Sequence, residues 1–189
     1  VMVNLRVDKD YKSVTTDESG TETTTQTLKE FRPESWRVVN IPKGSYVLPR
    51  AADMATDYFS TSAVAFETTE TKSFTSEKGT TYSTEVHGFS FYMLENRPAS
   101  KKSVGGNYHL RDRRVKDPAT GEYALDSNGE MWEYAPENGT YLEIKGEVVM
   151  DVDVSSDAKQ QQLAADVTYY IHLGDIASSK DNYSIERNT

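Results

Sequence analysis

Residues 140–154 read Thr-Tyr-Leu-Glu-Ile-Lys-Gly-Glu-Val-Val-Met-Asp-Val-Asp-Val, an alternating run around which the rest of the chain can be placed. Apolar side chains share one parity of this run, namely Leu142, Ile144, Val148, Met150, Val152 and Val154. The opposite parity is charged and holds Glu143, Lys145, Glu147, Asp151 and Asp153. Because successive side chains of a strand point to opposite faces, the run predicts one long strand with a dry and a wet face. Only Gly146 interrupts the dry face.

The chain then returns with the same pattern. Apolar residues again share one parity, which comprises Leu163, Ala165, Val167, Tyr169, Ile171 and Leu173, against Asp166, Thr168, Tyr170 and His172 on the other. The polar, turn-like segment 155–162 between the two runs predicts an antiparallel hairpin with a long loop. Its apolar face must meet another sheet, and burying it contributes roughly 20 kcal/mol gross, most of which chain entropy offsets. We therefore expect both Ile144 and Ile171 to be buried.

The other elements predict an all-β fold. Residues 1–7 and 36–41 alternate as strands, and residues 82–95 carry large apolar groups on both parities, which is typical of a central strand covered on both faces. Residues 108–116 are predicted as the only helix, capped by Asn107 and stopped by Asp117-Pro118. We expect one domain over residues 1–189, an antiparallel two-sheet β-sandwich with at most one short helix.

Composition excludes several classes of function. The net charge of −9 and the pI of about 4.9 repel a phosphate backbone and an anionic bilayer, so nucleic acid is not expected as a partner. The absence of cysteine excludes disulfides, thiolate metal sites and cysteine nucleophiles. No run approaches the roughly 20 apolar residues of a membrane span. The chain opens in mid-strand without a leader, and we expect it to be a mature or excised fragment.

No catalytic, cofactor or metal site is expected. Of the three histidines, His172 lies on the wet parity of its strand and His109 in the predicted helix, so ordinary surface or boundary positions are favoured for them and for His87. The spacing of Asp151, Asp153 and Asp157 does not fit a calcium loop, which favours a solvated face. No serine stands in GxSxG, and no carboxylate pair is singled out among the 30 acidic residues.

Two surfaces are weighed as binding sites. The basic cluster of Arg111, Arg113, Arg114, Lys101, Lys102 and Lys116 is interpreted as a helix face that balances an acidic protein, rather than as a receptor for an acidic partner. Trp36 and Trp132 are candidate ligand-facing aromatics for a sugar, although packing in the core or at its boundary is favoured for each. A carbohydrate-binding module would expose two or more coplanar aromatics. A hydrolase would hold a carboxylate pair, or a histidine with a perturbed pKa, in a deep pocket.

Several segments together carry a family resemblance: Trp36-Arg-Val-Val-Asn-Ile-Pro42, Gly88-Phe-Ser-Phe-Tyr-Met-Leu-Glu-Asn-Arg97, Tyr134-Ala-Pro-Glu-Asn138, Thr140-Tyr-Leu-Glu-Ile-Lys-Gly146, Tyr169-Tyr-Ile-His-Leu-Gly174 and Asn182-Tyr-Ser-Ile-Glu-Arg-Asn-Thr189. In this order they resemble the fimbrillin-like proteins of Bacteroidetes, the subunits of type V pili. The nearest branch is that of the larger members, whose matching C-terminal region is catalogued as a domain of unknown function. The resemblance spans residues 36–189 and is strongest in the final fifty.

The resemblance implies a transthyretin-like or Greek-key sandwich, export as a lipoprotein across the outer membrane, and a place in a cell-surface fimbria as a structural, anchor or adhesive tip subunit. It implies other fimbrial subunits as partners, joined by donor-strand exchange, and a host or bacterial surface glycan or protein as a further partner. A carbohydrate-binding module or adhesin domain of a cell-surface protein is the alternative.

The chain departs from the family pattern at its end. Members continue into a further apolar strand after the Arg-Asn motif, whereas Thr189 is the last residue here. A sheet that lacks a strand leaves unpaired N–H and C=O groups along its edge and favours strand addition. We therefore expect an assembly edge, exposed or filled by another chain, at Tyr183, Ile185, Arg187 and Asn188.

Overall fold

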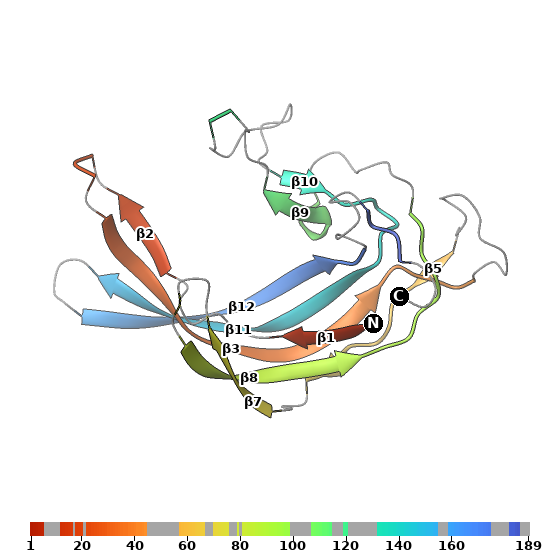
Figure 1. Cartoon of the computed structure of the whole chain (residues 1–189), viewed down its shortest axis with the longest axis horizontal. Coiled ribbons are helices and arrows are strands. Elements are labelled where there is room, and N and C mark those ends of the chain that lie inside the picture. Colours follow the sequence, from red (N-terminus) through yellow and green to blue (C-terminus); the bar gives the residue numbers. More distant parts are fainter. Residues whose placement is uncertain are drawn as a thin grey trace.

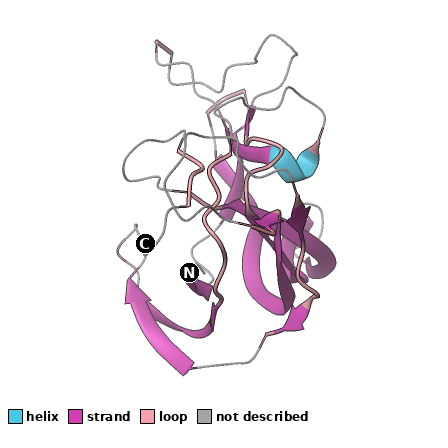
Figure 2. Cartoon of the chain, turned by 90° about the vertical axis from the view of Figure 1, so that its right-hand side faces the viewer, coloured by secondary structure: helices cyan, strands magenta, loops and turns pink. Residues whose placement is uncertain are grey.

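The fold consists of antiparallel sheets, as the sequence predicts. The computed structural model describes residues 1–5, 12–16, 18–20, 22–44, 57–66, 70–75, 79, 81–98, 107–114, 119–120, 132–154, 159–174 and 182–185. Every strand pairing among them is antiparallel. The single helical element among the described residues is the 3₁₀ turn η1 (Tyr108–Leu110), which Figure 2 shows beside the strands. The all-β prediction is confirmed.

Two larger sheets carry the fold (Figure 1). The first has the order β12-β11-β3-β2 and comprises β12 (Lys159–His172), β11 (Tyr141–Val154), β3 (Glu22–Val39) and β2 (Lys12–Thr16), with β6 (Val64–Ala65) also on β3. The second has the order β1-β8-β7 and comprises β1 (Met2–Leu5), β8 (Thr81–Ser90) and β7 (Glu70–Thr75). Two small pairs complete it: β9 (Arg111–Arg114) with β10 (Trp132–Tyr134), and β4 (Ile41–Pro42) with β5 (Tyr58–Phe59).

The predicted hairpin is present, and its two apolar parities share one face. Leu142 lies opposite Ile171 and Ile144 opposite Tyr169, and residues directly opposite each other point to the same side of a sheet. The strands are longer than predicted because β12 begins at Lys159, so the predicted loop 155–162 is wrong at its end. There the ladder continues, with Gln162 opposite Asp151.

The core lies where the two sheets meet. Val38, Ile41, Leu142 and Ile144 form its buried centre, and Ile144 has 0% of its surface exposed. The ring of Trp36 on β3 stacks on Phe89 of β8 with centroids 4.1 Å apart. Further partly buried side chains pack around this centre: Val3, Leu5, Phe31, Phe66, Phe91, Met93 and Leu173. Contact between two sheet faces through alternating apolar side chains is consistent with the predicted sandwich.

The prediction for the return strand is wrong in its packing. Ile171 is 41% exposed, Tyr169 49% and Leu163 54%, although Leu142 and Ile144, the neighbours of Ile171 and Tyr169 on β11, are in the core. The reason is that β12 is the edge strand of its sheet, and the second sheet packs over β3 and β11. His172, placed on the wet face by its parity, is instead buried at 6% exposure.

Two other predictions are corrected. Of the helix predicted over residues 108–116, the described residues 108–114 do not form an α-helix: η1 is followed at once by β9, which pairs with β10, and Asn107 makes no side-chain capping bond. A partner strand therefore overrides the local helical pattern. The strand predicted over residues 82–95 is central as β8, but it ends at Ser90, and in the remainder of the predicted range Tyr92 is fully exposed and Leu94 is 42% exposed rather than covered.

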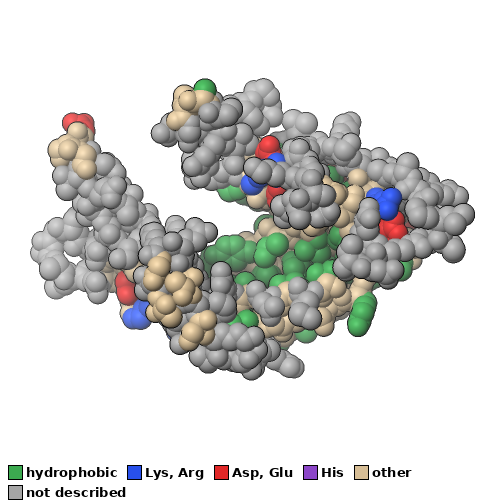
Figure 3. All heavy atoms as spheres, in the orientation of Figure 1, with side chains coloured by type: hydrophobic (Ala, Val, Ile, Leu, Met, Phe, Trp, Pro, Cys, Tyr) green, Lys and Arg blue, Asp and Glu red, His purple; other side chains and the backbone are tan. Residues whose placement is uncertain are grey.

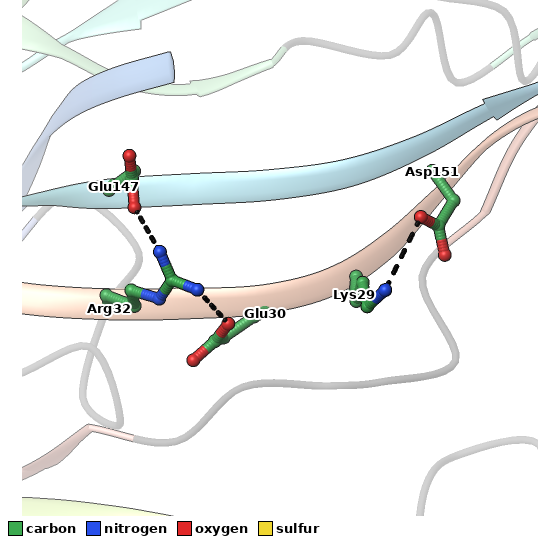
Figure 4. Close-up of polar contacts among 5 residues, drawn as sticks. All are labelled: Lys29, Glu30, Arg32, Glu147 and Asp151. Atoms are coloured by element: carbon green, nitrogen blue, oxygen red, sulfur yellow. Dashed lines mark hydrogen bonds and ion pairs between the residues drawn. The ribbon is translucent and has the colours of Figure 1, made fainter. Parts of the chain in front are cut away.

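The charged face of the hairpin forms an ion-pair ladder with β3 (Figure 4). Arg32 binds Glu147 and Glu30, each at 2.7 Å, and Lys29 lies 3.9 Å from Asp151. Arg37 binds Glu143 at 2.7 Å farther along the same two strands. The acidic parity of β11 is thus opposed by basic residues of β3, in keeping with the solvated face predicted for Asp151.

Arg37→Met is expected to lower the free energy of unfolding by about 1–2 kcal/mol. The carboxylate of Glu143 is buried at 7% exposure and would lose its close partner, with Lys145 at 3.8 Å as its remaining cation. Urea denaturation followed by circular dichroism measures the change. Arg32→Met is the matched control and should change stability much less, because Arg32 and its partners are more exposed. Equal losses in the two variants would contradict the prediction.

Candidate functional site

An uncovered apolar face lies on β12, which we call the open face and define as Leu163, Tyr169 and Ile171. Each of these side chains is between 41% and 54% exposed. Figure 3 shows hydrophobic side chains gathered in a hollow on this side of the molecule. The ring of Tyr169 makes an edge contact with Phe31, at 5.7 Å between centroids, so the open face is continuous with the core. An exposed apolar area that adjoins the core marks a surface on which something can dock.

The order of the second sheet explains why this face is open. Phe89 of β8 packs on Trp36 of β3 and on Phe66, which follows β6. The next strand, β1, brings Val3 and Leu5 to the core cluster that includes Leu142 of β11. β8 therefore packs over β3, and β1 reaches the same core cluster from the next position in its sheet. Among the described residues, no strand follows β1 on its other side.

Two strand edges border the same opening. Within the described part of the chain, β1 pairs with β8 alone and β12 with β11 alone. Each strand therefore presents backbone N–H and C=O groups on its other side. Strand edges of this kind accept an added strand from another chain, with the main chain supplying hydrogen bonds and alternate side chains filling the apolar face.

A second feature anchors residues 182–185. Asn96 is 1% exposed, and its Nδ2 donates to the carbonyl oxygen of Asn138 and to Thr140 Oγ1, both at 2.8 Å. Thr140 Oγ1 donates in turn to the carbonyl oxygen of Asn40, whose φ of +59° is tolerated by asparagine. The backbone N–H of Asn96 donates to Ile185 at 3.0 Å, and its carbonyl accepts from Ile185 at 2.7 Å. These buried bonds tie the segment to the end of the core.

The same segment is also held by a polar cluster that consists of Asp112, His172 and Tyr183. Tyr183 donates its hydroxyl to Asp112 Oδ2 at 2.8 Å, and His172 Nδ1 lies 3.7 Å from Asp112 Oδ1. Burial lowers the pKa of His172, and the Asp112 charge opposes this only in part. Burial and the hydrogen bond to Asp112 raise the pKa of Tyr183. At neutral pH, His172 is therefore uncharged and Tyr183 protonated.

The cluster is enclosed, which limits its chemistry. The His172 side chain is 1% exposed, and the rings of Tyr141 and Tyr183 lie 5.5 and 6.3 Å from the imidazole. Neither imidazole nitrogen faces solvent, and the backbone of His109 lies against the ring. An aspartate–histidine pair of this kind resembles a general-base pair in composition, but a base must reach the proton that it removes. The cluster instead connects β9, the end of β12 and the segment 182–185.

Two of the four predicted assembly residues, Tyr183 and Ile185, fall in this anchored segment. Tyr183 is buried at 7% exposure, and Ile185 forms an isolated bridge with Asn96. Arg187 and Asn188 lie outside the described residues, so their part of the edge stays a prediction. The open face is formed elsewhere, on β12, and sequence reasoning missed it because alternation does not tell an edge strand from a central one.

The two candidate tryptophans lie on separate elements. Trp36 is packed between the sheets against Phe89. Trp132 lies on β10, where the guanidinium of Arg111 stands 5.5 Å from its ring and 4.3 Å from the ring of Tyr108, which is 72% exposed. Arg111, expected on a helix face, therefore lies against two aromatic rings.

No three His, Asp or Glu side chains of the described ranges gather as a metal site would require. His109 and His172 lie on the ring of Tyr141, at 5.9 and 5.5 Å between centroids. Among the described residues, no helix has the length and apolarity needed to cross a membrane.

A known protein family covers the part of the chain that contains the open face and the anchored segment. A family model described as Domain of unknown function (DUF4906) matches residues 91–189, which is about half of the chain. The chain belongs to the DUF4906 family. The DUF4906 region contains the β11–β12 hairpin with its open face, and also Asn96, Asp112 and the segment 182–185. The strands β1 to β8 precede it. No curated protein and no solved structure matches the chain.

Proposed function

We propose that this DUF4906 protein is a structural or tip subunit of a bacterial surface fimbria, related to the fimbrillin-like proteins, and that it works by β-strand addition and surface presentation rather than by catalysis. The observation that carries the proposal is the open face of β12, together with the edge of β1 that has no partner strand among the described residues. An enzyme has no need of such a face, whereas a subunit that receives a strand from its neighbour requires one.

The added strand has a defined chemistry. It runs beside β1, exchanges main-chain hydrogen bonds with that edge, and turns alternate apolar side chains toward Tyr169 and Ile171. Full burial of a large apolar side chain contributes about 1.5–3 kcal/mol, so a few such residues together outweigh the cost of ordering a short segment. Other subunits of the same fimbria are the partners that we propose, after export as a lipoprotein across the outer membrane to the cell surface.

A single-cysteine experiment tests the proposal in native fimbriae. The chain has no cysteine, so Ile171→Cys introduces its sole thiol on the open face. We expect this thiol to react readily with a maleimide in the purified subunit, and about tenfold or more slowly once an added strand covers it in fimbriae sheared from cells. The measurement is the labelling rate by mass spectrometry.

Thr168→Cys is the matched control, because Thr168 is exposed on the opposite face of the same strand. Its labelling rate should be similar in the purified subunit and in the fimbriae. Equal labelling of Ile171→Cys in both states, or absence of the protein from sheared fimbriae, would overturn the proposal.

The carbohydrate-binding alternative draws support from the exposed Tyr108 on η1. A sugar stacks on the face of an aromatic ring, and Arg111 already lies over the rings of both Tyr108 and Trp132. Binding on a glycan array that is lost in Tyr108→Ala would favour this alternative over strand addition.

A further inference from the structure

The cluster of Asp112, His172 and Tyr183 joins three parts of the chain that are distant in sequence: β9, the end of β12 and the segment 182–185. His172 is buried, and the polar groups that favour its charged form are the carboxylate of Asp112 and the backbone of His109. Its Nδ1 is 3.7 Å from Asp112 Oδ1, which is too long for a hydrogen bond. A buried imidazole thus lies next to a carboxylate without engaging it.

Asp112 is shared among competing partners. Its Oδ2 accepts the hydroxyl of Tyr183 at 2.8 Å and lies 3.8 Å from Arg113, which also pairs with Glu133. The titratable or charged groups that act on His172 directly are His109 of η1, Asp112 of β9, Tyr141 of β11 and Tyr183. Behind them lie Arg113 next to Asp112, Glu133 of β10 next to Arg113, and Tyr170 of β12 next to His109 and Tyr141. The nearest carboxylate for a protonated His172 is therefore Asp112.

Protonation changes what Asp112 can do. An imidazolium carries a donor on each nitrogen, and a buried charge needs an opposite charge within contact. If the Asp112 carboxylate turns to close the gap of 3.7 Å to His172, its other oxygen moves away from Tyr183. The segment 182–185 then loses its side-chain bond to β9 and is held by its two backbone bonds to Asn96 alone, so those two bonds open more often.

We propose that His172 is a pH-sensitive latch: while it is neutral, Asp112 holds Tyr183 and the segment 182–185 in place, and when it is protonated it takes Asp112 and releases that segment. This inference rests on the fold alone and does not depend on the proposed function. Histidine suits the role because its ordinary pKa lies near 6.5, within reach of small changes in pH.

The sign of the pH dependence follows from burial. The pKa of His172 is below its ordinary value in the closed form, and it rises when the segment opens, because water reaches the ring and Asp112 pairs with the imidazolium. As the pH falls through the pKa of the open form, that form binds the proton more tightly, so the closed form loses stability. The loss stops once His172 is protonated in both forms, and above the pKa of the open form the closed form keeps its full stability.

Hydrogen exchange on the full chain tests the latch. After correction for the intrinsic pH dependence of exchange, we expect the backbone amides of Ile185 and Asn96 to exchange faster at pH 5.0 than at pH 7.5. The expected factor is about ten for each unit by which the two pKa values differ. Amides at the centre of β11 should show no such change. Unchanged protection of Ile185 and Asn96 at pH 5.0 would overturn the inference.

Two variants separate the latch from a general effect of acid. His172→Phe keeps an aromatic ring in the same place but cannot titrate, so the difference between the two pH values should disappear. His109→Gln should retain it. If His172→Phe does not fold, Tyr183→Phe decides: without its hydroxyl the segment should exchange as fast at pH 7.5 as the unsubstituted protein does at pH 5.0. A pH response that persists in His172→Phe, or full protection at pH 7.5 in Tyr183→Phe, would overturn the proposal.

Discussion

Gly146→Ala is expected to lower the free energy of unfolding by about 2–3 kcal/mol, the cost of overpacking a filled interior. A Cβ at this position would lie 2.5 Å from the carbonyl oxygen of Arg32 and 2.8 Å from the ring of Phe31. The oxygen belongs to the backbone of the neighbouring strand β3 and cannot move without disturbing the ladder. Urea denaturation followed by circular dichroism measures the loss.

The expected loss of stability in Gly146→Ala is opposite to the usual effect of replacing glycine by alanine. Replacing glycine by alanine within a strand normally gains about 0.5–1 kcal/mol, because glycine loses more conformational freedom on folding. Gly146 lies at a β-bulge where β3 has an extra residue, Glu34, between the partners of Lys145 and Gly146. The bulge brings the two backbones together, so close approach decides the outcome.

Gly44→Ala is the control for Gly146→Ala, because no atom lies within 4 Å of its added Cβ. It should change stability by less than about 0.5 kcal/mol, as surface substitutions usually do. A Gly146→Ala variant as stable as Gly44→Ala would show that the strands can separate at the bulge without cost.

The hairpin could be predicted from the sequence because alternation is a local property. Leu142 and Ile144 are buried, and their register with Ile171 and Tyr169 brings the two apolar parities to one face, as the pattern requires. Burial of the whole face could not be predicted in the same way. Whether Ile171 is covered depends on how many strands the other sheet has, and that number is set by pairings between distant segments.

The candidate site was less predictable still. His172 has the parity of a wet position, yet η1, β9 and the segment 182–185 cover that end of β12 and bury it. The contact with Asp112 spans 60 residues of sequence and depends on β9 being a strand rather than the helix that its local pattern favours. A correct assignment of β9 would have been the signal that brings Asp112 and His172 together.

Asn96→Ala is expected to destabilise the fold by about 3 kcal/mol, because it removes two hydrogen bonds and leaves buried acceptors unpaired. The amide nitrogen of Asn96 serves both Asn138 and Thr140, and both Asn96 and Thr140 are almost completely buried. Asn96→Asp should cost a similar amount at pH 7, since a carboxylate of the same shape would turn an acceptor toward the carbonyl oxygen of Asn138. Thermal or urea unfolding measures both losses.

A double-mutant cycle distinguishes this network from simple loss of packing. Thr140 Oγ1 accepts from Asn96 and donates to the carbonyl oxygen of Asn40, so Thr140→Val breaks the same chain of bonds at its middle. Combined with Asn96→Ala, it should cost at least about 0.5 kcal/mol less than the sum of the two single changes, as expected for residues that share a network. If the losses of stability in the two single variants simply add, Asn96 contributes through its volume alone and not through its hydrogen bond to Thr140. The side-chain network would then not help to hold the segment 182–185, which carries Tyr183 and pairs with the backbone of Asn96 through Ile185.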